Sequence, residues 1–115
     1  MLRLTLALAL VACGGGSSAK DAPMNATIQT VSCTGITPAA TVTTNATGTA
    51  YVMPATTISQ GQVVEFMMPQ AHNVASSTPG LAVDFGHTAC LMFTAPGTYS
   101  FKCSVHLFTG TITVQ

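Results

Sequence analysis

The chain has 115 residues, enough for one domain with a modest hydrophobic core. It contains only three Lys or Arg and three Asp or Glu residues, so its formal net charge is zero and it lacks the basic surface of a nucleic-acid-binding protein. So few carboxylates also leave acid–base catalysis with few candidate groups. No apolar run in the sequence reaches the roughly 18 residues that a membrane-spanning helix needs.

The N-terminus has the pattern of an export signal. Arg3 precedes an apolar run at residues 4–11, and the small residues Ala12 and Cys13 close that run. The sequence LVAC at residues 10–13 resembles the lipobox of bacterial lipoproteins, which implies cleavage before Cys13 and acylation of its thiol. The alternative is an ordinary secretory signal. Lipidation would anchor the protein to a membrane of the cell envelope, on the periplasmic side or on the outer surface.

These features divide the chain into three parts. We expect a lipoprotein signal peptide at residues 1–12, a lipidated flexible tether at residues 13–24 and a folded domain at residues 25–115. The tether is rich in Gly, Ser and Ala and has no apolar periodicity. Because export leads to an oxidising compartment, where disulfides persist, pairing of Cys33 with Cys90 is the simplest use of two of the four cysteines.

The folded domain has the pattern of an all-β protein. Short segments rich in Thr and Val alternate with turn residues, and no helical period of apolar residues is sustained. Many short strands at this spacing predict a β-sandwich or barrel. The candidate strands, in chain order, are residues 26–32, 41–44, 49–53, 62–68, 71–75, 81–83, 88–94, 98–103 and 111–114.

One cysteine and two histidines have a spacing that points to metal chemistry. Tyr99, Phe101 and Cys103 alternate along one strand, so they share its inward face, and a buried structural cysteine is the simple interpretation. However, His106 follows just past the strand, and His72 lies 31 residues upstream of Cys103 beside apolar residues. A thiolate with two imidazoles is the ligand set that suits copper in a trigonal site.

The segments around these residues resemble the cupredoxins, the family of plastocyanin and amicyanin. The resemblance lies in PGTYSFKCSVH at residues 96–106, in QAHNV at residues 70–74 and in GTITV at residues 110–114. Residues 57–66 also fit the family's pattern of a strand, a turn Gly and a further strand, so the resemblance covers most of residues 50–115. It implies a Greek-key β-sandwich or barrel of the cupredoxin type that binds one copper ion and is not an enzyme.

The resemblance also implies roles for individual residues. His72, Cys103 and His106 would be the equatorial copper ligands. Asn73, which follows the first histidine, would tie the two ligand loops together by hydrogen bonds.

The axial copper ligand of the family is missing from its usual place. Relatives with a short ligand loop place a methionine three residues after the second histidine, where this chain has Thr109. Three interpretations remain open: no axial ligand, a distant oxygen from Thr109 or from the backbone near Ala71, or a methionine from elsewhere. The candidate methionines are Met67, Met68 and Met92. We favour a weak or absent axial ligand and expect a comparatively high reduction potential, because the axial ligand tunes the potential.

We interpret the chain as a monomeric carrier of single electrons between redox partner proteins of the cell envelope. By analogy with the family, Leu107 and Phe108 would form part of an apolar docking surface. Two alternatives are a copper-delivery protein and a metal-free β-sandwich held by a disulfide. A closed zinc site that adds Cys90 to the three ligands is a further alternative. We expect His87 to be an exposed turn residue.

Overall fold

The structure, a computed structural model, describes residues 27–115. The predicted signal peptide, the lipidation site Cys13 and the tether lie outside the described residues, so they stay predictions. Residues 27–115 form eight strands and no helix, which confirms the predicted all-β class. A helix of the length and hydropathy needed to cross a membrane is accordingly absent from this part of the chain.

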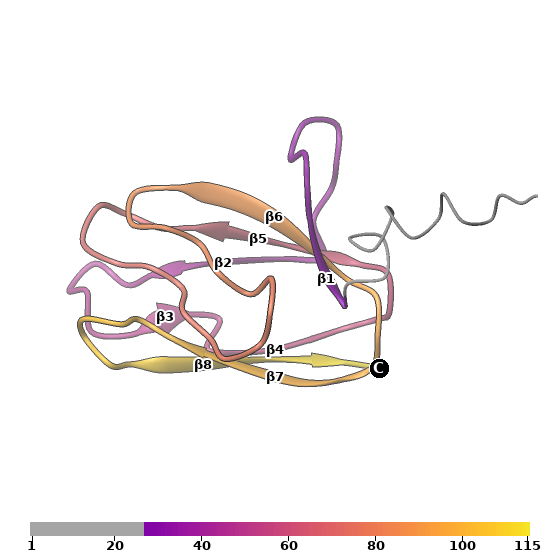
Figure 1. The fold of residues 1–115 in the computed structure, drawn as a ribbon. Helices are drawn as coiled ribbons and strands as arrows, with labels where there is room; N and C mark the ends of the chain where they lie inside the picture. The colour runs from indigo at the N-terminus through magenta and orange to yellow at the C-terminus, as the bar shows by residue number, and fades with distance from the viewer. Residues whose placement is uncertain (1–26) are drawn as a thin grey trace, which may run out of the picture.

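The strands form two sheets that lie over one another (Figure 1). Their bounds are β1 Ile28–Val31, β2 Ala40–Thr44, β3 Tyr51–Val52, β4 Ala55–Ile58, β5 Val63–Met67, β6 Thr88–Phe93, β7 Gly97–Lys102 and β8 Thr109–Val114. The five-stranded sheet has the order β1-β6-β5-β2-β3, and the three-stranded sheet has the order β4-β8-β7. The β2–β5 and β4–β8 pairs are parallel and the other pairs are antiparallel.

Alternating apolar side chains fill the space between the sheets. Val64 and Phe66 of β5 are fully buried, and so are Leu91 and Phe93 of β6. From the other sheet, Phe101 of β7 meets Phe66 edge-on, with the ring centroids 5.5 Å apart. The period of two in the sequence therefore determines which face of each strand turns inward, and burial of these side chains is the main source of stability.

Two of the predicted strands are not strands. Residues 71–75 and 81–83 contribute only isolated bridges, Val74 to Val83 and Ala75 to Lys102. They belong to the long connection between β5 and β6, which folds back on itself and leaves too few consecutive residues for a ladder. Conversely, β4 is missing from the predicted strands. Its exposed and buried positions are occupied by Ala, Thr and Ile, so the hydrophobic contrast along the strand is small.

Cys33 and Cys90 form a disulfide between the end of β1 and β6, as the export signal led us to expect. This bond occupies the Cys90 sulfur, and Cys90 does not belong to the cluster formed by the other predicted ligands. The alternative of a closed zinc site that includes Cys90 is therefore wrong. The alternation along β6 explains why: Cys90 and the inward-facing Leu91 point to opposite faces of the sheet.

Candidate metal centre

Two loops at one end of the sandwich carry the predicted ligands. His72 lies in the loop after β5, where its backbone N–H donates to the Pro69 carbonyl at 3.1 Å. Three residues later, Ala75 pairs with Lys102 at the end of β7 through two backbone hydrogen bonds of 2.8 and 2.9 Å. Because Cys103 directly follows Lys102, this pairing brings the His72 loop beside Cys103.

A tight turn brings His106 back toward Cys103. The Leu107 backbone N–H donates to the Cys103 carbonyl at 2.9 Å, and the Cys103 N–H donates to the Phe108 carbonyl at 3.0 Å. Leu107 adopts a left-handed backbone conformation with a φ of 66°. This turn lets the chain reverse and enter β8 three residues after the second histidine.

The three donor atoms face one another. Nδ1 of His72 and Nδ1 of His106 each lie 3.7 Å from the Sγ of Cys103, and the ligand atoms all lie within 4.8 Å of one another. An ion about 2.0 Å from each nitrogen and about 2.3 Å from the sulfur, at angles between tetrahedral and trigonal, requires nitrogen–sulfur separations of about 3.5 to 3.7 Å. The two nitrogen–sulfur separations therefore fit an ion the size of copper.

The three side chains differ in their access to solvent. Cys103 is fully buried and His72 is 6% exposed, whereas His106 is exposed. The cluster is therefore closed on its protein side and reaches the surface through the second histidine.

The surroundings of Cys103 favour its thiolate form. Burial raises the pKa of the Cys103 thiol, but hydrogen bonds from the backbone N–H groups of Asn73 and His106, and then from the two imidazoles, outweigh burial and lower the pKa to about 6. A thiolate is the form of cysteine that binds a metal. The hydrogen bonds to Cys103 thus favour the metal-binding form of its sulfur.

Asn73 joins the two ligand loops. Its Oδ1 accepts hydrogen bonds from the backbone N–H of Ser104 at 2.9 Å and from the Ser104 hydroxyl at 3.2 Å. The Tyr51 hydroxyl in turn donates to the Asn73 carbonyl at 2.6 Å. Asn73 therefore makes contacts of the kind that the resemblance implies, and Tyr51 anchors it to the neighbouring β3.

Sequence analysis did not identify Tyr51 as part of the site. Its ring packs against Phe101 at 4.8 Å and against Phe108 at 4.7 Å between centroids. Burial, followed by the negative charge of Cys103, raises the pKa of Tyr51, so the hydroxyl remains a hydrogen-bond donor. A bulky aromatic residue in an otherwise Thr-rich segment was the only signal for it in the sequence.

Gly48 is the second residue that sequence analysis missed. It has a left-handed φ of 69°, and a Cβ built on it would lie 2.8 Å from Nε2 of His72. The loop between β2 and β3 can therefore lie against this imidazole only if it has no side chain at that position. The signal in the sequence was a Gly at the end of the turn that begins at Asn45.

Two of the candidate axial donors, Thr109 and Met92, lie on strand faces that turn away from the cluster. Thr109 pairs with Lys102 in the β7–β8 ladder, and both side chains are exposed on the face of the sheet opposite Phe101. Met92 lies on the face of β6 opposite Leu91, and its partner in β5 is at the end of the ladder far from the His72 loop. In both cases the alternation of the strand turns the side chain away from the core that holds the cysteine.

The remaining candidate residues differ in their exposure to solvent. Met67 is 45% exposed, and Met68 is buried in the hydrophobic core. Ala71 directly precedes His72 and is exposed, and its backbone carbonyl stays a candidate for a distant axial oxygen. His87 is exposed and lies outside the donor cluster.

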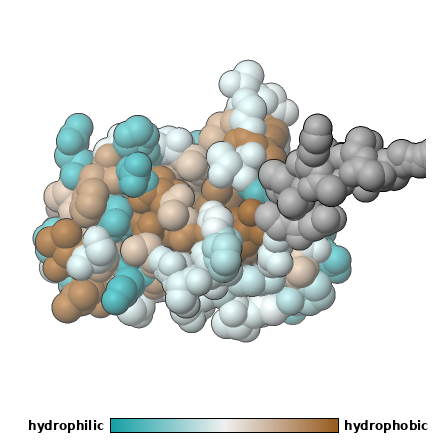
Figure 2. Space-filling view, in the orientation of Figure 1, coloured by the Kyte–Doolittle hydropathy of each residue, from teal (hydrophilic) through white to brown (hydrophobic). Residues whose placement is uncertain are grey.

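The two residues predicted for partner docking, Leu107 and Phe108, differ in their exposure to solvent. Leu107 is 66% exposed, and Val105 beside it, which was not predicted, is 62% exposed. Phe108 is partly buried against the core, where it contacts the Tyr51 ring. Figure 2 shows apolar residues gathered at the end of the molecule where β7 turns into β8.

The two-sheet fold with a His–Cys–His cluster at one end is the cupredoxin fold. No protein-family model and no curated protein matches the sequence. Among solved structures, an oxidized amicyanin variant is 21% identical, with 77% of this chain and 99% of that chain covered and a TM-score of 0.61. Amicyanin from Paracoccus versutus (Thiobacillus versutus) is 20% identical, with 78% and 99% covered and a TM-score of 0.57. These similarities establish the fold of the chain.

Proposed function

We propose that this protein carries single electrons between redox partner proteins of the cell envelope, with one copper ion as its cofactor. The observation that carries the proposal is the convergence of a buried cysteine sulfur and two imidazole nitrogens, with nitrogen–sulfur separations that fit such an ion. When bound, copper supplies a one-electron couple between Cu(I) and Cu(II). The similar amicyanin structures include oxidized, reduced and Cu(I) forms, which supports this choice of cofactor.

The chain's own residues would keep the site rigid during electron transfer. Hydrogen bonds from Ser104 to Asn73 hold the two ligand loops together, and Tyr51 holds Asn73 from the other side. Because the ligands are fixed by these outer contacts, His72, Cys103 and His106 need not move when the charge of the site changes. Small rearrangement is what a one-electron carrier requires.

We also propose that the centre has a weak or absent axial ligand. Thr109 and Met92 face away from the cluster, which supports this proposal, and a distant oxygen would have to come from a backbone carbonyl such as that of Ala71. A missing axial thioether favours a comparatively high reduction potential.

Partner docking would take place at the end of the molecule around His106. Leu107 and Val105 present apolar surface beside this exposed histidine, while Phe108 packs against the hydrophobic core. Apolar surface of this kind marks interaction sites. Lipidation at Cys13 would hold this monomeric carrier at an envelope membrane.

Titration of the full chain with Cu(II) tests the proposal. A strong absorption band near roughly 600 nm, where thiolate-to-copper charge transfer falls in such sites, is expected at one equivalent. The Cys103→Ser variant should take up copper without this band. Weak visible absorption with tight Cu(I) binding would instead favour a copper-delivery protein, and no copper uptake would leave a metal-free β-sandwich.

A further inference from the structure

We propose that Cys33, Glu65 and Cys90 form a second metal site, which binds a divalent zinc-like cation after a dithiol has reduced the Cys33–Cys90 disulfide. This site is on the outer face of the five-stranded sheet and shares no residue with the copper centre. The inference therefore does not depend on the function proposed above.

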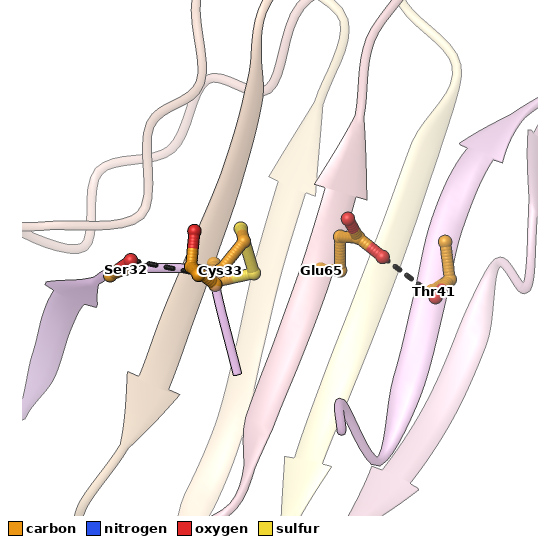
Figure 3. Close-up of a disulfide and its surroundings, with 6 residues drawn as sticks. Ser32, Cys33, Thr41 and Glu65 are labelled. Carbon is orange, nitrogen blue, oxygen red and sulfur yellow. Dashed lines mark hydrogen bonds between the residues drawn. A yellow bond between two sulfur atoms is a disulfide. The ribbon is translucent and has the colours of Figure 1, made fainter. Parts of the chain in front are cut away.

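Two of the three ligands are already fixed side by side. Glu65 of β5 and Cys90 of β6 are direct partners in the antiparallel ladder, so both side chains leave the sheet on the same face. The carboxylate and the two sulfur atoms all lie within 4.8 Å of one another (Figure 3). Both strands have neighbours on each side, so this half of the site is part of the rigid centre of the sheet.

The third ligand is placed so that the disulfide can open. Cys33 follows the end of β1 and lies outside the strand ladder, whereas Cys90 is only 1% exposed. Cys33 is partly exposed, so it is the more accessible side of the disulfide for attack by an external thiolate. A dithiol would supply two electrons and two protons and become a cyclic disulfide, and Cys33 and Cys90 would each become a thiol.

The charge of the reduced cluster selects the kind of metal. Binding would release the two thiol protons to solvent and leave two thiolates and one carboxylate, a formal charge of minus three. The only Lys or Arg in residues 27–115 is Lys102, which lies in the other sheet, so no side-chain cation compensates Glu65 there. A divalent ion neutralises more of this charge than Cu(I) does, and mixed sulfur and oxygen ligands suit zinc.

Glu65 is also oriented by a neighbour. The Thr41 hydroxyl of the adjacent β2 donates to Oε1 of Glu65 at 3.4 Å. Figure 3 shows Thr41 and the disulfide on the two sides of this carboxylate. Outer contacts of this kind hold carboxylate ligands in position in metal sites.

The test uses the full chain with Cys13→Ser and Cys103→Ser, so that Cys33 and Cys90 are the only thiols. The protein is reduced with dithiothreitol, freed of reductant without air, and titrated with Zn²⁺ in competition with a chromophoric chelator. We expect the reduced protein to bind one equivalent of Zn²⁺ more than the oxidised protein, because any binding at His72 and His106 is common to both forms. Adding Glu65→Gln should weaken binding by about tenfold or more, whereas Asp84→Asn, which removes another described carboxylate, should not.

The comparison with Glu65→Gln remains decisive if reduction unfolds the protein. In an unfolded chain Glu65 is far from both cysteines in sequence, so Zn²⁺ binding there should not depend on Glu65. If the site is real, Zn²⁺ should restore the near-ultraviolet circular dichroism of the reduced protein, and more weakly in Glu65→Gln. Equal zinc affinity with and without Glu65→Gln, or no additional binding by the reduced protein, would overturn the proposal.

Discussion

At the scale of single residues, Cys103 shows how its surroundings decide protonation. Its folded pKa of about 6 lies below the ordinary value of 9.0, so between these values the folded protein binds fewer protons than the unfolded chain. The stability from this group is therefore fully present above pH 9 and is lost as the pH falls through 6. For the metal-free protein we expect the free energy of unfolding to rise by about 2 kcal/mol from pH 6 to pH 8.

Denaturant unfolding at the two pH values measures this difference. The Cys103→Ser variant is the control, because it removes the titrating group and keeps the histidines. If the variant shows the same rise with pH as the parent protein, the thiol is not its source.

Gly48 shows how a residue without a side chain can leave room for the imidazole of His72. Gly48→Ala should destabilise the metal-free protein by about 1 to 2 kcal/mol through its left-handed backbone alone. The new methyl group would also meet Nε2 of His72, so the copper absorption band should shift as well. Gly61→Ala is the matched control. Gly61 has a similar φ of 86° but nothing within 4 Å, so that variant should lose stability without a spectral change.

A substitution at Thr109 tests whether its side chain points away from the metal centre. Because Thr109 shares the outer face of β7–β8 with Lys102, Thr109→Met should leave the copper spectrum and the reduction potential unchanged. Thr109→Leu, similar in size but without sulfur, should behave in the same way. A lower potential in the Met variant alone would show that this side chain reaches the metal.

At the scale of strands, the close pairing of β7 and β8 depends on Gly110. Its cross-strand partner is Phe101, and a Cβ on Gly110 would lie 2.5 Å from the end of the Phe101 ring. Gly110→Ala should therefore force the ring out of its place between Tyr51 and Phe66 and destabilise the protein by about 1 to 3 kcal/mol, as overpacked cores do. Thermal or denaturant unfolding measures the loss. Adding Phe101→Leu should recover part of it, since the shorter side chain leaves room for the methyl group.

Strands and contacts between loops differ in how far the sequence predicts them. The alternation of Val64 with Phe66 and of Leu91 with Phe93 is a local pattern, so it predicts β5 and β6 and their inward faces directly. The spacing of Cys103 and His106 is also local. In contrast, Tyr51 reaches Asn73 across 22 residues, and Gly48 approaches His72 across a similar distance in sequence. These contacts follow from the packing of two loops, which no local period encodes.

At the scale of the whole molecule, the scarcity of charge limits the electrostatic forces between two copies of the protein. Glu65, Asp84 and Lys102 are the only fully charged side chains in residues 27–115. Two such molecules that meet at their His106 ends would experience little electrostatic steering or repulsion. If the proposed function is correct, the rate of electron self-exchange between reduced and oxidised copies should change less than about twofold between low and moderate salt.

A charge added beside His106 should make that rate depend on salt. Leu107→Glu places a negative charge on the apolar surface that both copies present, so self-exchange should slow at low salt and recover as salt screens the repulsion. Gln115→Glu adds the same charge at the C-terminus, which lies at the opposite end of the sandwich (Figure 1). Line broadening in nuclear magnetic resonance spectra of mixed redox states measures the rates. Equal salt dependence in the two variants would mean that copies do not meet through the His106 end.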